Sequence, residues 1–121
     1  MIDVKYFAGF VDSDGSISIH VQKRDEDRYG LYPKVQIGQL TFRRENLEEI
    51  AKEYEVEVRE KTGTNFSVVE LTGSKAQTFL NLIKNHLVVK DEVCEYILSL
   101  PKEVGREELK AIRSVIKKLR K

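Results

Sequence analysis

A run of nine residues near the start of the chain, Phe-Ala-Gly-Phe-Val-Asp-Ser-Asp-Gly at positions 7–15, constrains the fold more than any other segment. It predicts an apolar helix that ends in two carboxylates and a glycine. Ala8 and Gly9 carry so little side chain that a second helix can approach closely there. Asp12 and Asp14 would then lie at the end of that contact. A plain helix terminus, with a positive φ at the glycine, is the alternative interpretation.

Hydrophobic periodicity predicts an alternation of helices and strands along the rest of the chain. We expect helices over about 3–12, 44–54, 91–100 and 106–119, with another that begins near residue 74. We expect strands over about 16–24, 31–41 and 66–72, with a further short strand near 56–58. The sequence shows no linker that would divide it into two domains. The prediction is therefore one domain spanning residues 1–121.

Three local expectations follow from residue types at the element ends. Gly30 ends a polar connector and is available for a turn. Pro33, near the start of the second strand, favours a sheet edge or a strand end. Ser74 and Gln77 match a capping box, in which each side chain satisfies an exposed main-chain amide.

Composition excludes several classes of protein. No apolar run approaches the ~20 residues that cross a bilayer. Asp3 and Lys5 interrupt the apolar start, so we expect no signal peptide, no membrane partner and an intracellular location, cytoplasmic in a prokaryote. The single cysteine, Cys94, excludes an internal disulfide and a cysteine-based zinc site. The sequence has no glycine-rich phosphate loop and no Ser-His-Asp triad, so we expect no small-molecule substrate.

The distribution of charge is more informative than the formal net charge of +1. Residues 44–57 carry six acids against two bases, whereas residues 106–121 carry seven bases against two acids. A protein that binds DNA on one face can keep acidic residues on another. Solvated helix faces explain each segment equally well when it is taken alone.

The nine-residue run resembles the signature of the LAGLIDADG homing endonucleases, with Phe twice for Leu, Val for Ile and Ser for Ala. The expected element order is also similar to that family's αββαββα fold, an α+β fold with a curved antiparallel four-stranded sheet and C-terminal helices. Only one copy of the motif is present. The resemblance therefore implies the single-motif type, in which two identical chains pair their motif helices.

The same resemblance implies a metal site at the end of the first helix. Asp14 is expected to be the direct ligand, assisted by the main-chain carbonyl of Ser13. Asp12 is expected to have a structural role at the helix end, and with Ala8 and Gly9 it would lie at the dimer interface. Hard oxygen ligands suit Mg²⁺, and Mn²⁺ or Ca²⁺ would be able to substitute in binding.

Three more residues stand at positions that match the catalytic set of the single-motif enzymes. Gln39 corresponds to a glutamine at the end of the second strand, where it would position the attacking water. Arg43 corresponds to a basic residue that orders solvent. Lys90 corresponds to a lysine before a late helix, where a cation stabilises charge on the phosphate. Taken singly, each is equally an ordinary surface residue.

Strand alternation predicts which side chains would read DNA bases, because a β-ribbon fits the major groove. The expected outward set mixes hydroxyl, amide, imidazole and cationic groups, and the register of its hairpin members is open by one residue. The set consists of Ser18, His20, Gln22, Arg24, Lys34, Gln36, Arg59, Lys61, Asn65 and Ser67.

These inferences favour a site-specific double-strand DNA endonuclease of the homing type. It would hydrolyse phosphodiesters with divalent metal ions shared across a homodimer, and its partner would be double-stranded DNA with a long pseudo-palindromic site. An RNA maturase, a DNA-binding protein without cleavage and a subunit that pairs with a different chain remain alternatives.

Overall fold

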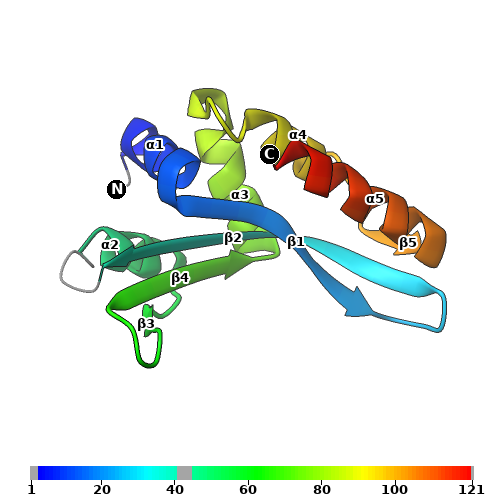
Figure 1. The fold of residues 1–121 in the computed structure, drawn as a ribbon, viewed down its shortest axis with the longest axis horizontal. Coiled ribbons are helices and arrows are strands. Elements are labelled where there is room, and N and C mark those ends of the chain that lie inside the picture. The colour runs from blue at the N-terminus through cyan, green and yellow to red at the C-terminus, as the bar shows by residue number, and fades with distance from the viewer. Residues whose placement is uncertain (1–2, 41–44, 121) are drawn as a thin grey trace.

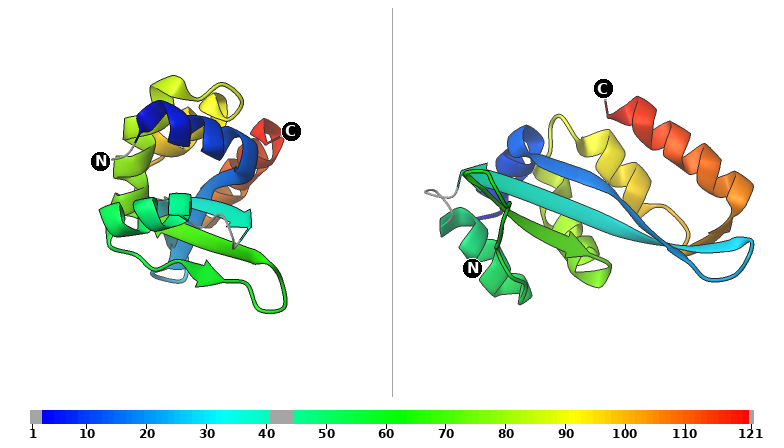
Figure 2. Two further views of the ribbon diagram at one scale, coloured as in Figure 1. Left: turned by 90° about the vertical axis from the view of Figure 1, so that its left-hand side faces the viewer. Right: turned by 60° about the horizontal axis from the view of Figure 1, so that its bottom comes forward.

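A twisted antiparallel sheet, with helices packed on one of its faces, forms the fold (Figures 1 and 2). The computed structural model describes residues 3–40 and 45–120. The elements in chain order are α1 (Val4–Asp14), β1 (Gly15–Lys23), β2 (Arg28–Leu40), α2 (Glu45–Tyr54), β3 (Arg59–Glu60), β4 (Phe66–Thr72), α3 (Ser74–Ile83), the 3₁₀ helix η2 (Lys84–His86), α4 (Asp91–Leu98), β5 (Glu103–Gly105) and α5 (Arg106–Leu119). This is the mixed α+β architecture that the sequence predicts, with β5 as an added short strand.

Strand β2 is the centre of the sheet, whose order is β1-β2-β4-β3. One edge of β2 pairs with β1 in a long hairpin that places Gly15 opposite Ile37. The other edge pairs with β5 over residues 28–30 and with β4 over residues 34–40. The sheet therefore has two wings on that side of β2, one completed by β5 and the other by β4 and β3 (Figure 1).

The expectation that Pro33 marks a sheet edge is wrong for the strand as a whole, and the pairing explains why. Pro33 lies between the β5 and β4 ladders, opposite Ile19 of β1. The N–H of Leu31 donates to the carbonyl of Lys102 on the β5 side, so the nitrogen of Pro33 faces the same side. The missing N–H therefore falls where the two ladders meet, at a local edge inside a central strand.

Two other local expectations are also corrected. Gly30 lies within β2, opposite Gln22, so the turn comes earlier in the polar connector. Helix α3 begins at Ser74, and its N-cap is Gly73, with a φ of +71° and no side-chain capping bond. Because Ser74 is already inside the helix, it cannot cap the helix with Gln77.

The core lies between the sheet and the helices, where the predicted apolar stripes meet. Ala76, Phe79, Leu80 and Ile83 of α3 are all fully buried, as their helical spacing predicts. Helix α5 has the predicted bounds and buries its stripe of Leu109, Ile112 and Ile116. Cys94 is also fully buried, in agreement with its expected role as a small core residue.

Candidate functional site

Helix α1 ends at the acidic run, and close packing accounts for the glycine that follows it. The N–H of Gly15 donates to the carbonyl of Val11. A Cβ on Gly15 would lie 3.0 Å from the Cα of Val11, a tighter contact than nearly all real Cβ atoms make. The φ of Gly15 is −101°, so the alternative interpretation with a positive φ is wrong. Glycine is needed here for space, and the chain turns directly from α1 into β1.

The exposed side chain of Asp14 opens on a hollow of about 210 Å³ on the face of the sheet opposite the helices, which we call the outer face. This acidic hollow is also lined by Gln36 and Gly38 of β2 and by Lys61 from the turn between β3 and β4. Three segments far apart in sequence thus meet around one carboxylate. The hollow combines an anionic oxygen donor with a cation that can contact phosphate.

Asp12 ties the end of α1 to the segment that precedes α4. Its Oδ2 accepts a hydrogen bond from the N–H of Val88 at 2.7 Å, and its Oδ1 accepts from the N–H groups of Val89 and Lys90 at 3.2 and 2.9 Å. The Nζ of Lys90 donates in return to the main-chain carbonyl of Asp12 at 2.6 Å. The Asp12 carboxylate thus pairs amides next to the start of α4, and the ammonium group of Lys90 is held at the end of α1.

The side chains of Gln39 and Ser13 do not line the acidic hollow. Gln39 is half-buried near the end of β2, opposite Ser67 of β4, and alternation puts it on the face of Val35 and Ile37. The acidic hollow is lined by its neighbour Gly38 instead. The hydroxyl of Ser13 donates to the carbonyl of Gly9 at 3.1 Å, back along the helix. Arg43 lies outside the described residues.

The outer face of the β1–β2 hairpin carries the predicted polar set. Ser18 lies opposite Lys34, and His20 lies opposite Tyr32, with ring centroids 6.4 Å apart. The guanidinium of Arg24 lies over the ring of Tyr32, 5.8 Å from its centroid, and donates to the Tyr32 hydroxyl. The sequence analysis did not single out Tyr32. Its position two residues before Lys34 is the signal that would have placed it here.

On the β3–β4 side, one of the residues expected to contact DNA is buried instead. Ser67 is fully buried, because the residues of β4 that share its parity face the helices. Arg59, Lys61 and Asn65 are exposed. Glu70, which the sequence analysis missed, lies opposite Gln36 on the outer face. Its Oε2 is 3.6 Å from the Nζ of Lys34 and 3.7 Å from Nη2 of Arg59. Two predicted DNA-contacting cations therefore share one carboxylate.

One side of α1 faces away from the core. Ala8 is fully buried in the chain's own core, so its expected place at the dimer interface is corrected. Gly9 is exposed, and a Cβ built on it meets no described atom within 4 Å. Tyr6, Val88 and Val89 are 48%, 80% and 68% exposed. Val88 and Val89 lie beside the end of α1, because their N–H groups donate to Asp12. We call Tyr6, Gly9, Val88 and Val89 the α1 patch. Its side chains leave the helix backbone accessible at Gly9.

The donor chemistry at Asp14 fits a hard divalent cation when further ligands come from outside the chain. Within residues 3–40 and 45–120, no three His, Cys, Asp or Glu side chains gather as a ready-made metal site. The Asp14 carboxylate is exposed and supplies the oxygen ligand that Mg²⁺ and Ca²⁺ prefer. One chain thus offers one carboxylate, and coordination there needs oxygens from a second chain, phosphate or water.

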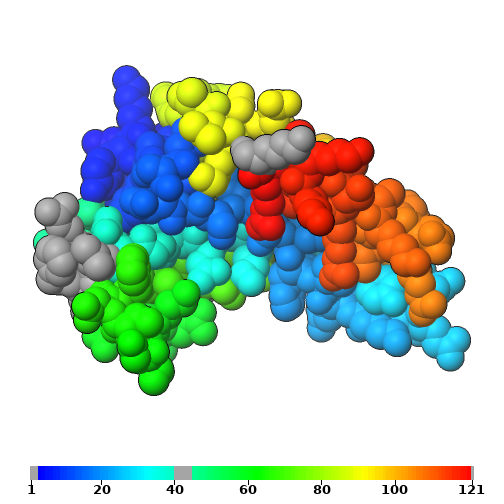
Figure 3. All heavy atoms as spheres, in the orientation of Figure 1, coloured from blue at the N-terminus to red at the C-terminus, as the bar shows by residue number. Residues whose placement is uncertain are grey.

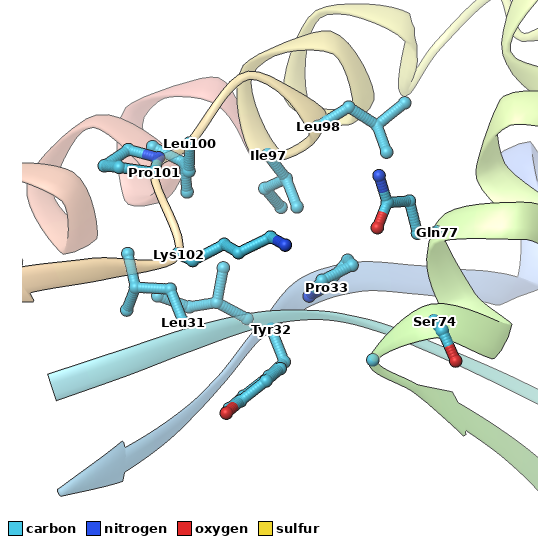
Figure 4. A pocket seen from close by; sticks show the side chains of 12 residues that line it. Leu31, Tyr32, Pro33, Ser74, Gln77, Ile97, Leu98, Leu100, Pro101 and Lys102 are labelled. Carbon is cyan, nitrogen blue, oxygen red and sulfur yellow. The ribbon is translucent and has the colours of Figure 1, made fainter. Parts of the chain in front are cut away.

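A separate hollow of about 290 Å³ lies on the helix side of the sheet (Figure 4). Leu31 of β2 and Ile97 of α4 form apolar parts of its wall, and Gln77 and Lys102 bring polar groups to it. The described residues that line this hollow include no carboxylate. Burial raises the pKa of the core thiol of Cys94 to about 11 and keeps it neutral.

The chain matches a known protein family. Residues 7–96 match the family described as LAGLIDADG endonuclease. The match covers most of the chain, from α1 through strands β1 to β4 and into α4. The protein belongs to the LAGLIDADG endonuclease family.

Several solved structures have the same fold. The homing endonuclease I-CvuI, in complex with the I-CreI target in the presence of Mg, is 25% identical, with a TM-score of 0.64. That match covers 78% of this chain and 62% of I-CvuI, so the present chain spans less than two thirds of its relative. I-CvuI was also solved in complex with its own target in the presence of Ca.

Two further structures extend the comparison. The archaeal intron-encoded homing endonuclease I-Vdi141I, complexed with DNA, is 25% identical with a TM-score of 0.59 over 78% of this chain and 63% of that one. The meganuclease I-SmaMI, bound to uncleaveable DNA, is only 16% identical, but it matches 98% of this chain and 45% of its own with a TM-score of 0.75. The latter likeness concerns the fold alone.

A comparison with curated proteins gave no match. Among the described residues, the helices are too short or too polar to span a bilayer.

Proposed function

We propose that this protein is a site-specific double-strand DNA endonuclease of the homing type that acts as a homodimer. The observation that carries the proposal is the position of Asp14. It is an exposed carboxylate at the end of the family's motif helix, and it opens on the polar outer face of the twisted sheet. Relatives with the same fold were solved in complex with DNA, which supports DNA as the partner.

The dimer is proposed to form through the α1 patch. Gly9 allows close approach of a second α1, while Tyr6, Val88 and Val89 provide apolar area around the contact. A two-fold axis beside Gly9 would bring the Asp14 side chains of two chains together. Their mutual repulsion would favour a shared divalent cation between them.

The chemistry is proposed to use groups at the end of α1. The Asp14 carboxylate and the Ser13 carbonyl would hold Mg²⁺, which supplies charge neutralisation and an activated water when bound. The expected part of Gln39 in orienting that water does not fit its place on the helix-facing side of β2, opposite the buried Ser67. Lys90, held 2.6 Å from the Asp12 carbonyl, would donate to the phosphate and stabilise its developing charge. Mn²⁺ or Ca²⁺ would support binding in place of Mg²⁺.

DNA recognition is proposed to use the outer face. Side chains that donate and accept hydrogen bonds suit base edges in the major groove. A dimer would place two such faces along one pseudo-palindromic site. The proposed contact residues are Ser18, His20, Gln22, Arg24, Tyr32, Lys34, Gln36, Arg59, Lys61 and Asn65.

Selection from a randomised duplex library tests the proposal. Purified protein is incubated with the library with and without Mg²⁺, and cleaved ends are sequenced. Recovery of one long, nearly palindromic site that is cut only with Mg²⁺ supports the endonuclease. Selective binding without cutting by the unaltered protein would instead support a DNA-binding protein. Sedimentation of the DNA complex as one chain per site would contradict the shared centre.

A further inference from the structure

A groove between the outer edge of β1 and helix α5 gathers cations and hydroxyl groups. It consists of two hollows of about 260 and 360 Å³, and Arg120 lines both. We call the pair the α5 groove. The polar side chains that line it are Ser16, Ser18, Lys90, Arg113, Lys117 and Arg120. The four cations come from the α4 start and from the last two turns of the chain's C-terminal helix and its cap.

A hydrogen bond holds the end of α5 against β1, the edge strand of the sheet, and so defines the groove. Nη2 of Arg120 donates to the carbonyl of Ile17 at 3.3 Å, across 103 residues of sequence. Atoms of α5 (orange to red) lie beside those of the β1–β2 hairpin in Figure 3. Since the N–H and C=O of one strand residue point to the same edge, Ile17 and Ile19 both present main-chain groups to the groove.

The positive charge of the groove is not neutralised by any carboxylate among the described residues that line it. The contrast with the outer face of the sheet is clear, because Lys34 and Arg59 share Glu70 there. On α5 itself, Lys110 pairs with Glu107 at 3.8 Å, outside the groove lining. The α5 groove therefore offers uncompensated positive charge next to hydrogen-bond donors, which suits a phosphate chain.

We propose that the α5 groove binds the phosphodiester backbone of the DNA strand that passes along the outer edge of β1. This inference rests on the proposed DNA-binding function and assigns it a second contact surface beyond the sheet. A sheet inserted in the major groove has one DNA backbone along each of its edges, because that groove is only about 12 Å wide. β1 is one of these edges.

The α5 groove begins beside the end of α1 and extends along α5, which supports its proposed role in binding the DNA backbone. Lys90 lines one hollow, and its Nζ contacts the Asp12 carbonyl at the end of α1. Arg113 and Lys117 line the other hollow, further along α5. A backbone that follows the groove would therefore run from the proposed cleavage centre outward. Such contacts fix the position of the duplex without reading its sequence.

Salt-dependent DNA binding by variants of α5 tests the inference. Arg113→Gln and Lys117→Gln each remove one groove cation, and both residues are outside the proposed catalytic set. Lys118→Gln is the matched control, because Lys118 is an exposed cation of the same helix that lines neither hollow. Binding to the selected duplex is measured by fluorescence anisotropy in Ca²⁺ over a range of salt concentrations. Circular dichroism confirms that each variant is folded.

Each groove variant is expected to make the slope of log K against log salt shallower by about 0.9 per chain, the value for one lost phosphate contact. The slope for the control should stay near that of the unaltered protein, and Arg113→Lys should restore it. Equal changes for Lys118→Gln and the groove variants would overturn the inference. An unaltered protein that binds no DNA would instead remove the proposed function, and this inference with it.

Phosphate ethylation interference with the unaltered protein gives a readout that needs no substitution. Modified phosphates that block binding should form a run on the strand beside β1, extending outward from the cut. Their confinement to phosphates next to the cleavage position would contradict a backbone contact along α5.

Discussion

The Nζ of Lys90 lies 2.6 Å from the carbonyl oxygen of Asp12, and the carboxylate of Asp12 accepts three main-chain N–H groups from residues 88–90. The two residues thus hold each other across 78 residues of sequence. A cation at the C-terminal end of α1 also meets the negative end of that helix. Asp12 therefore connects the stability of the fold with the place of a proposed catalytic lysine.

Replacing Asp12 by Asn is expected to lower the free energy of unfolding by about 1–3 kcal/mol, because charge-assisted hydrogen bonds are lost. Asn keeps one acceptor oxygen, and its NH₂ group would face a main-chain N–H. Urea denaturation measures the change. Asp25→Asn, in an exposed turn, is the control and should change stability by less than about 0.5 kcal/mol.

A double-mutant cycle with Lys90→Met shows whether Asp12 also positions the lysine. If it does, Asp12→Asn should slow single-turnover cleavage in the parent protein and have little further effect when Lys90 is Met. The coupling expected for contacting residues is about 0.5–3 kcal/mol. Fully additive effects on the cleavage rate would assign Asp12 a purely structural role.

Asp14→Asn should abolish metal-dependent cleavage, with a loss of at least about 10³-fold, because it removes a charged oxygen ligand at the proposed metal site. Affinity for the duplex in Ca²⁺ should change far less, since phosphate and base contacts remain. Plasmid cleavage and gel-shift assays measure the two properties. Glu92→Gln, an exposed carboxylate in the first turn of α4, serves as the control and should cleave normally.

Gly9→Arg is expected to produce a folded monomer that does not cleave. A side chain at this position meets open space in the single chain, so the fold should tolerate it, whereas a close helix pair should not. Analytical ultracentrifugation measures the assembly. Ser114→Arg, on an exposed position of α5, is the control. Retention of the dimer by Gly9→Arg would rule out the α1 patch as the interface.

The thiol of Cys94 should not react with a disulfide reagent in the native protein at pH 8. Burial raises its pKa to about 11 from its usual 9.0, so the reactive thiolate is scarce as well as inaccessible. The stability that this neutral thiol contributes is fully present below pH 9 and is lost as the pH rises through 11. Rapid labelling without denaturant would contradict the burial.

The helices were predictable from the sequence because their apolar stripes have one clear phase. The bounds of α5 agree with the prediction at both ends, since Leu109, Ile112 and Ile116 define a single face. Strand β5 was missed because three residues are too few to show alternation. Ser67 was assigned to the wrong face because Val68 and Val69 are consecutive apolar residues, which leaves the phase of β4 open.

Within the candidate site, the sequence singled out Asp14 and Lys90 but not their surroundings. The nine-residue motif is local, so the end of α1 follows from it directly. The hydrogen bonds that join Asp12 to residues 88–90 depend on the packing of α1 against η2, which no local pattern encodes. Glu70 and Tyr32 enter the outer face only through the register of β2 with its two neighbours.

The break at Pro33 in the hydrogen-bond ladder on one edge of β2 has an evolutionary consequence. Because β5 and β4 pair with separate stretches of that edge, a slip in one ladder need not propagate into the other. The distal wing, with the hairpin turn and β5, can then accept insertions or new side chains while the wing beside Asp14 keeps its alignment. We expect laboratory selection for new targets to alter the distal wing readily at little expense to catalysis.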